Sequence, residues 1–315
     1  EINYGKRVKN DGFTALIRQG SILDLELTDS TISLKRGKDE IQIKSFLRTN
    51  GKLGFSQIKT IAFLFGLNTN AFKDINGTVN LKTNINFDLG KNFKIKNLLY
   101  KIEGDITSFE IYTEENRIIK KYFPEYDPRI ILKDTKIKFT KSKFDQNAEF
   151  NGLIKIKEQF DDFNIREKYN CNKKSFDING TINLTNSKVQ VSRLNYYKDS
   201  GKKSEIDFNI NFILNKYYNI QNLKFLADKT KIYLSNIKLN KNFETDDFKQ
   251  LEIKTFLNGI KNNDFLVNKL QKVTILGEVF DAEPLLKSLY KKDDKKTFSK
   301  NFNSEVKVNF DKALT

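Results

Sequence analysis

The sequence predicts a mainly β protein: an elongated, twisted antiparallel sheet of repeated strand units that forms an open groove, U-shaped in section, with one or two short helices. Three features predict this fold: strict alternation of apolar and polar side chains, turn dipeptides between the alternating runs, and only three prolines in 315 residues. A period of two places one set of side chains on each face of a sheet. A polar second set is typical of antiparallel sheets that are wet on one side.

Alternating segments occur along most of the chain, and Asn and Lys fill many of the polar positions between the apolar ones. The apolar positions that we expect to share one face of the sheet, and to line the groove, are Ile85, Phe87, Ile182, Leu184, Val189, Val191, Ile210 and Phe212. Asn-Gly or Asp-Gly dipeptides favour tight hairpins because both residues tolerate positive φ, with bulges inside strands as the alternative. These dipeptides occur at 11–12, 50–51, 76–77, 151–152, 179–180 and 258–259.

Two short helices are predicted. The first covers about residues 116–122 and ends near Pro124. The second, near residues 281–292, begins with Asp281 as its N-cap and has Pro284 in its first turn. Its apolar side is formed by Leu285, Leu286 and Leu289. Residues 60–67 fit a helix or a buried strand, because periodicity does not separate the two for so short a run.

The chain also repeats itself. Residues 84–98 (NINFDLGKNFKIKNL) and 209–223 (NINFILNKYYNIQNL) match at nine of fifteen positions, and residues 75–81 (INGTVNL) are echoed by residues 178–184 (INGTINL). We therefore expect one or more β-groove units over 1–150, a second unit with the short helix over 151–297, and the start of a further unit over 298–315. Since the chain has no Met, we expect it to be a piece of a longer protein.

Composition excludes several kinds of chemistry. The chain has no His and a single Cys, Cys171, so Ser-His-Asp and Cys-His catalysis and an internal disulfide are impossible within it. Adjacent carboxylates occur at 114–115, 161–162 and 246–247, but they lie between strand-like runs beside Lys or Asn, and nothing indicates the pocket that a catalytic pair needs. We expect no enzymatic activity, no metal and no cofactor.

The formal net charge of +16 has two interpretations. A basic surface can attract nucleic acid or anionic lipid. Alternatively, A+T-rich codons account for the abundance of Lys, Asn, Ile and Phe together. Basic and aromatic residues do interleave at 193–198, but the aromatics mostly occupy the apolar phase of strands, where they are ordinarily core. We therefore expect no nucleic-acid partner. No segment approaches the roughly 20 apolar residues of a membrane-spanning helix.

A family resemblance rests on three segments. Residues 176–197 (FDINGTINLTNSKVQVSRLNYY) and 218–239 (YNIQNLKFLADKTKIYLSNIKL) resemble strand pairs of AsmA-like periplasmic proteins, in particular their YhdP-like branch. That branch has a segment of the form G-x-x-[FL]-D-[AL]-x-P-L-[LI], which is matched here by Gly277, Phe280, Asp281, Pro284, Leu285 and Leu286. The resemblance is best from about residue 170 onwards and weaker before 70. The chain departs from the family in its Asn/Lys-rich composition and in having no Trp near Pro124.

The resemblance implies a repeating β-groove protein that carries phospholipid between the inner and outer membranes without catalysis, as part of outer-membrane biogenesis. It implies a periplasmic location, with an inner-membrane anchor in a segment outside this chain. The implied partners are phospholipid acyl chains, both membranes and possible other envelope proteins. Two alternatives stay open: a structural or adhesive cell-surface solenoid or sandwich with a closed core, and a basic nucleic-acid-binding protein.

Overall fold

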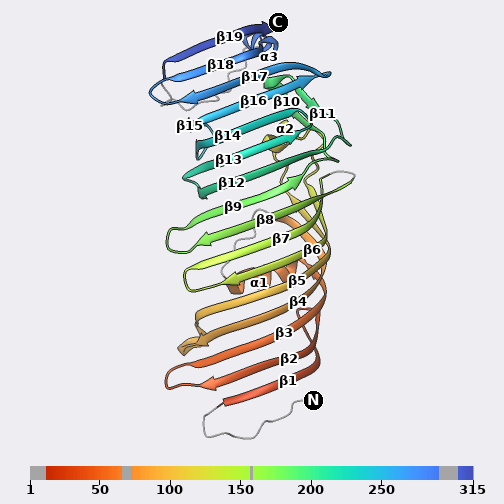
Figure 1. Cartoon of the computed structure of the whole chain (residues 1–315). Coiled ribbons are helices and arrows are strands. Elements are labelled where there is room, and N and C mark those ends of the chain that lie inside the picture. Colours follow the sequence, from red (N-terminus) through yellow and green to blue (C-terminus); the bar gives the residue numbers. More distant parts are fainter. Residues whose placement is uncertain (1–11, 66–71, 157–158, 291–303, 315) are drawn as a thin grey trace. The chain divides into compact units, whose positions relative to one another are not determined.

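The computed structural model describes residues 12–65, 72–156, 159–290 and 304–314 (Figure 1). Of these described residues, 71% are in strands and 9% in helices. Within the same described part, 17 strands belong to one mixed sheet that is not closed into a barrel, and two further strands form a small separate sheet. The predicted mainly β fold with an open sheet and few short helices is therefore confirmed.

Contacts divide the chain into two units, which are described separately here. Unit 1 comprises residues 1–115, 127–155 and 166–173, and unit 2 comprises residues 116–126, 156–165 and 174–315. Consecutive strands of unit 1 pair antiparallel from the first to the seventh. They are β1 (Gly12–Ile22), β2 (Leu25–Arg36), β3 (Ile41–Gly54), β4 (Phe72–Leu89), β5 (Ile95–Thr113), β6 (Arg129–Lys141) and β7 (Asp145–Lys155). Strand β8 (Phe160–Asn170) contributes residues to both units.

One helix packs on the sheet of unit 1. Helix α1 (Phe55–Phe65) places Ile58, Ile61 and the buried Ala62 three and four positions apart, which aligns them on one side of the helix. Ile58 and Ile61 pack on a cluster of buried strand residues. The members of that cluster are Leu25, Leu53, Val79, Ile106 and Ile137. Residues 60–65, for which helix and strand were both open, are thus helical, and the last two residues of that segment lie outside the described part of the chain.

Unit 2 continues with antiparallel pairing, except at its last strand. Its strands are β9 (Ser175–Asn183), β10 (Val189–Val191), β11 (Tyr196–Lys198), β12 (Ser204–Ile213), β13 (Tyr217–Ala227), β14 (Thr230–Asn240), β15 (Thr245–Asp247), β16 (Gln250–Leu257), β17 (Ile260–Lys269), β18 (Val273–Asp281) and β19 (Val306–Leu314). Strands β18 and β19 pair parallel, so the expectation of a wholly antiparallel sheet is wrong there. Residues 282–305 separate the two strands, and a connection of that length lets the second strand run in the same direction.

Both predicted short helices are present. Helix α2 (Arg117–Tyr122) is capped by Asn116, whose Oδ1 accepts the backbone N–H of Ile119 (3.1 Å). Helix α3 (Glu283–Tyr290) has Pro284 in its first turn, and Asp281 Oδ1 accepts the backbone N–H of Glu283 (3.1 Å). Two short 3₁₀ turns, η1 (Lys91–Phe93) and η2 (Ser192–Leu194), complete the described helical elements.

Most Asn-Gly dipeptides lie inside strands rather than in hairpin turns. Only the pair at 258–259 forms a turn, between β16 and β17, with φ of 51° at Asn258 and 81° at Gly259. The pairs at 50–51, 76–77, 151–152 and 179–180 are within β3, β4, β7 and β9, so the hairpin interpretation is wrong for them. At Gly77 the reason is a close approach across the sheet. A Cβ there would lie 1.9 Å from the Phe109 ring, so the aromatic ring occupies the space a side chain would need.

The stronger sequence repeat has a structural counterpart. Residues 84–98 run from the end of β4 through a turn into β5, and residues 209–223 run in the same way from β12 into β13. The weaker echo differs, because residues 75–81 lie in β4 itself, whereas residues 178–183 lie in β9, a separate strand that pairs with β12. The two echoes therefore do not repeat as one block, and the predicted unit boundaries stay predictions.

Candidate functional site

In unit 2, alternate residues of neighbouring strands form one apolar face of the sheet. On β12, Ile210 lies opposite Ile178 of β9 and Ile220 of β13. The next position of that phase, Phe212, lies opposite Phe176 and Tyr218. The positions between them carry polar side chains: Asn211 Nδ2, for example, donates to Asp177 Oδ1 (2.7 Å). The phase predicted from the alternation is thus present in the pairing of the strands.

Four aromatic rings follow one another along this apolar face. Phe176 and Phe212 stack with their centroids 4.9 Å apart, Phe212 and Tyr218 with theirs 5.6 Å apart, and Tyr218 and Phe243 with theirs 4.5 Å apart. We call these four residues the aromatic row. The row extends from β9 across β12 and β13 to the turn that precedes β15. Offset stacking of this kind stabilises each pair by roughly 0.5–1.5 kcal/mol beyond area burial.

Unit 1 has an equivalent apolar face on β4. Ile85 lies opposite Ser45 of β3 and Tyr100 of β5, and Phe87 lies opposite Ile43 of β3. Both predicted residues are half-buried, and neither belongs to the cluster that α1 covers. Helix α1 therefore leaves this part of the face uncovered.

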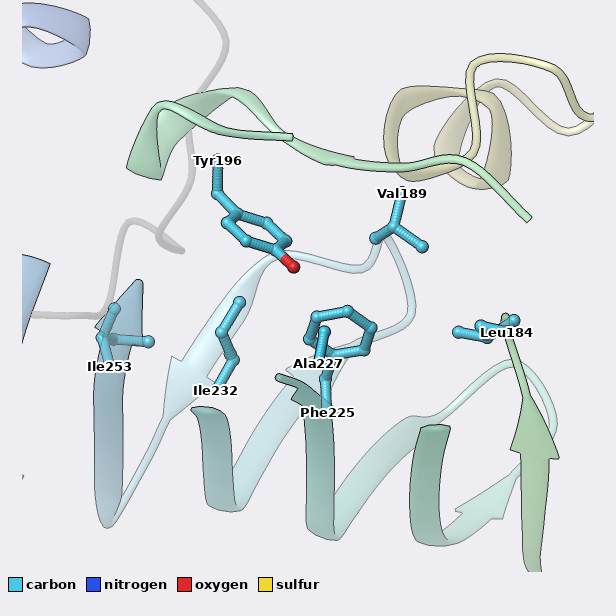
Figure 2. Close-up of a cluster of buried hydrophobic side chains, with 7 residues drawn as sticks. All are labelled: Leu184, Val189, Tyr196, Phe225, Ala227, Ile232 and Ile253. Carbon is cyan, nitrogen blue, oxygen red and sulfur yellow. The ribbon is translucent and has the colours of Figure 1, made fainter. Parts of the chain in front are cut away.

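A small second sheet covers part of the apolar face in unit 2. Strands β10 and β11, with η2 between them, form what we call the cap (residues 189–198). Figure 2 shows Val189 and Tyr196 of the cap pointing toward side chains of the main sheet. The ring of Tyr196 meets that of Phe225 edge-on, with the centroids 6.0 Å apart. The buried cluster consists of Leu184, Val189, Tyr196, Phe225, Ala227, Ile232 and Ile253.

The predicted groove residues therefore separate into two sets. Ile182, Leu184, Val189 and Val191 meet in the cluster under the cap, where Leu184 is 1% and Val189 5% exposed. Val189 and Val191 belong to the cap, not to the main sheet. The other set is half-buried and belongs to none of the described clusters. It consists of Ile85 and Phe87 in unit 1 and Ile210 and Phe212 in unit 2.

Buried amides hold the cap to β17 and β18. Asn263, which is 0% exposed, donates through Nδ2 to the carbonyl of Leu194 (2.8 Å), and its Oδ1 accepts the backbone N–H of Asp281 (3.1 Å). Asn262 Nδ2 also donates to the Leu194 carbonyl (3.0 Å). From the cap itself, Asn195 Nδ2 donates to Asp281 Oδ2 (3.0 Å). Since buried polar groups are costly unless they are paired, this network favours one position of the cap.

A buried lysine fixes the other end of the cap. Lys198 is 2% exposed, and its Nζ donates to four backbone carbonyls at 2.9–3.2 Å. Those carbonyls belong to Leu184, Thr185, Asp199 and Lys202. Desolvation lowers the pKa of Lys198, against the opposing effect of the Asp161 carboxylate. Burial likewise raises the pKa of Asp161, whose carboxylate accepts hydrogen bonds from Asn186 and Ser187.

The first part of the family-like segment lies within the sheet. Gly277 of β18 faces Phe265 of β17, and a Cβ on it would lie 2.4 Å from the Phe265 Cβ, so the two backbones approach closely there. Phe280 stacks on Phe310 of β19 with the ring centroids 5.1 Å apart. Both rings also meet Phe265 edge-on. These residues bind the last strands of the unit together.

The second part of that segment connects β18 to α3. Asp281 is 5% exposed and joins the amide network of the cap while also capping α3. Pro284 follows in the first turn of the helix. Leu285 and Leu286 remain 52% and 39% exposed. In this chain the segment therefore joins β18 to α3 and helps to hold the cap.

Sequence reasoning did not find Lys198 or the amides at 195, 262 and 263. Asn and Lys are so abundant that no local signal distinguishes these residues from solvent-exposed ones. Within the described ranges, no cluster of His, Cys, Asp or Glu has the arrangement of a metal site. The helices in that part of the chain are also too short or too polar for any of them to cross a membrane.

Comparisons with known proteins do not assign the chain to a family. No family model and no solved structure matches it. It is similar to Protein Ycf2 of Physcomitrium patens, with 28% identity over 259 residues, which cover 75% of this chain and 10% of that protein. The chain thus spans about a tenth of that relative's length. None of these findings bears on the resemblance to AsmA-like proteins, which stays a prediction.

Proposed function

We propose that this chain is a non-catalytic lipid carrier that holds phospholipid acyl chains against the uncovered apolar faces of its units. The proposal rests on one observation: helix α1 and the cap cover only parts of the apolar faces. Among the described residues, α1 packs on one cluster of unit 1 and the cap on one cluster of unit 2, while Ile85, Phe87, Ile210 and Phe212 lie outside all described clusters. An apolar face of this kind needs an occupant, because contiguous exposed apolar surface favours aggregation.

Acyl chains have suitable chemistry for such a face. Each buried methylene contributes about 0.8 kcal/mol, so a long chain gains affinity from area alone, without directed polar contacts. The aromatic row adds a continuous run of stacked apolar rings to the face, and the opposite phase carries amides and carboxylates such as Asn211 and Asp177. Together with the family resemblance, this supports phospholipid transfer between inner and outer membranes in the periplasm, with anchoring through a segment outside this chain.

Photo-crosslinking at two adjacent positions tests the proposal. A photoreactive amino acid at Phe212 lies on the apolar face, and the same amino acid at Asn211 lies on the polar face of the same strand. We expect the purified Phe212 variant to crosslink to co-purified or added phospholipid and the Asn211 variant to crosslink much less. Equal labelling at both positions, or labelling at Asn211 alone, would contradict carriage on the apolar face.

A structural module with closed cores is the second candidate. The near-complete burial of Leu184 and Val189 favours it for the capped part of unit 2. Native mass spectrometry of the purified chain separates the two candidates, because a structural module carries no lipid. The carrier is supported if the unchanged chain retains phospholipid and the Ile210→Asp variant does not.

A further inference from the structure

The hairpin turns of unit 2 lie at the two opposite ends of its strands. Each row of strand ends is called an edge here, in contrast to an edge strand. Because successive antiparallel strands reverse direction, the turns β12–β13, β14–β15 and β17–β18 lie at one edge, at the left-hand ends of their strands in Figure 1. The turns β13–β14 and β16–β17 lie at the opposite edge. We call the first set the tip edge.

Each turn of the tip edge presents a large apolar side chain to solvent beside a lysine. The apolar residues are Leu214, Phe243 and Leu270, which are 56%, 51% and 85% exposed. The lysines of the same turns are Lys216, Lys241 and Lys272. Of these, Lys272 makes an exposed ion pair with Glu305 at 3.5 Å. The acidic neighbour Glu244 accepts a hydrogen bond from the Asn240 side chain (2.9 Å).

The same combination occurs independently in unit 1. In the turn between β4 and β5, Phe93 is 84% exposed between Lys91 and Lys94. In the turn between β6 and β7, Phe144 is 50% exposed, and the Nζ of Lys143 lies 5.3 Å from the centre of its ring. Strands β4 and β6 run in the same direction, so these two turns share one edge of unit 1.

Backbone conformation makes this exposure unusual. The tripeptide Lys-Asn-Phe occurs in the turns at 91–93 and 241–243, and in both turns the Phe has positive φ, 57° at Phe93 and 61° at Phe243. A bulky residue rarely adopts this conformation, and Gly or Asn would occupy it with less strain. Two turns thus hold a phenylalanine that is at least half exposed, at a conformational cost. Retained strain of this kind points toward a use for the exposed ring.

From these turns we infer that the tip edge is a docking surface for an anionic phospholipid bilayer. The Leu and Phe side chains insert at the boundary between headgroups and acyl chains, and the neighbouring lysines meet the phosphates. Phe243 also belongs to the aromatic row, so one inserted ring is continuous with the apolar face of unit 2. The inference does not rest on lipid carriage, since a protein can dock on a bilayer without carrying lipid.

Exposed leucines distinguish this surface from a nucleic-acid surface. Lysines would meet either kind of phosphate, and a phenylalanine can stack on a base. Leu214 and Leu270 offer no ring for stacking, whereas hydrocarbon accepts them as readily as it accepts Phe243. The more exposed of these leucines, Leu270, therefore favours a bilayer over a nucleic acid as the partner.

A single tryptophan reports insertion, because the chain has none of its own. We expect fluorescence from a Phe243→Trp variant to shift to shorter wavelength when vesicles of phosphatidylcholine and phosphatidylglycerol are added, and brominated lipid to quench it. The matched control is Ile260→Trp, since Ile260 is 72% exposed at the opposite edge and begins the strand that ends beside Leu270. Equal shifts for both variants, or none for Phe243→Trp, would overturn the inference.

Flotation with the same vesicles measures affinity. We expect each of Leu214→Ser, Phe243→Ser and Leu270→Ser to weaken binding roughly tenfold, and Lys216→Glu with Lys241→Glu to abolish the preference for phosphatidylglycerol over pure phosphatidylcholine. Ile260→Ser and Lys229→Glu at the opposite edge should bind like the unchanged chain, and circular dichroism verifies that every variant is folded. Unchanged flotation of the tip variants overturns the inference, as does loss of oligonucleotide binding alone in the lysine variants, which would assign the edge to nucleic acid.

Discussion

At the scale of single residues, Lys198 shows how one cation organises a backbone. Its four carbonyl partners come from the segment after β9 and from the turn after β11, two stretches that are also joined by the hydrogen bond from the Gly201 N–H to the Thr185 carbonyl (2.8 Å). An ammonium has only three N–H donors, so at least one of them is shared between two carbonyls. Hydrogen bonds to a charged donor are the stronger kind, which compensates part of the desolvation that lowers the pKa of Lys198.

Replacing that lysine by an uncharged side chain of similar length removes a donor from all four carbonyls. The carbonyls of Leu184 and Thr185 keep the backbone N–H groups of Ser187 and Gly201 as partners. We expect Lys198→Met to lower the free energy of unfolding by about 1–3 kcal/mol, because it removes hydrogen bonds from a charged donor to four carbonyls, including those of Asp199 and Lys202. Urea unfolding followed by circular dichroism measures the change. The exposed Lys229→Met is the control and should change stability by less than about 0.5 kcal/mol.

The pH dependence of the same variant has a definite sign. Since the pKa of Lys198 is lower in the folded chain, the unfolded chain binds this proton more tightly, and stability rises with pH up to the ordinary lysine pKa. In the Lys198→Met variant, the free energy of unfolding should therefore rise less steeply with pH in this range. A variant that kept the full alkaline rise in stability would show that another group produces it.

At the scale of elements, much of the fold follows from periodicity and end signals. The alternation around Ile85 and Ile210 placed both on the apolar side of the sheet, because the period of a strand depends only on the backbone. Helix α3 was predictable from Asp281 and Pro284, whose roles at a helix start are local. The prediction of a hairpin turn at Gly77 was wrong, because the ring that fills the space beside this glycine belongs to Phe109, a residue 32 positions away.

The cap lies beyond such local reasoning. Val189 and Val191 alternate like residues of a sheet strand, yet they belong to a separate ribbon. What places that ribbon is a set of amides on β17, about 70 residues later in the chain. Tertiary contacts of this kind have no sequence signal in a chain so rich in Asn.

Asn263 is the amide on which the position of the cap depends most. Asn263→Ala leaves the Leu194 carbonyl and the Asp281 N–H without this partner, so we expect it to destabilise unit 2 by about 1–3 kcal/mol. Hydrogen exchange should rise first in residues 189–198, and rise less in β5 and β6, which pack under α1. Asn309→Ala on the exposed side of β19 serves as control. Equally faster hydrogen exchange over the whole chain would contradict the interpretation that Asn263 holds the cap locally.

At the scale of the whole molecule, charge and apolar surface are kept apart by the alternation of the strands. The net charge of +16 is spread over polar positions, often in exposed pairs such as Lys231 with Glu252 (2.7 Å) or Arg129 with Glu110 (2.8 Å). Pairs of this kind contribute little to stability. If the chain carries lipid as proposed, the positive excess favours association with anionic headgroups, and the apolar faces determine which acyl chains bind.

Lipid bound to the apolar faces should raise the free energy of unfolding of the chain. A ligand that binds only the folded chain raises the free energy of unfolding by about 2.7 kcal/mol at a hundredfold excess over its Kd. We expect a monomeric lysophospholipid to raise the unfolding midpoint of the delipidated chain, and glycerophosphocholine, which has the headgroup but no acyl chain, to leave it unchanged. Ile210→Asp should abolish the stabilisation because it places a charge on the apolar face, while Asn209→Asp on the polar phase of the same strand should retain it. Equal stabilisation by both compounds would mean that a polar site, and not the apolar face, binds the lipid.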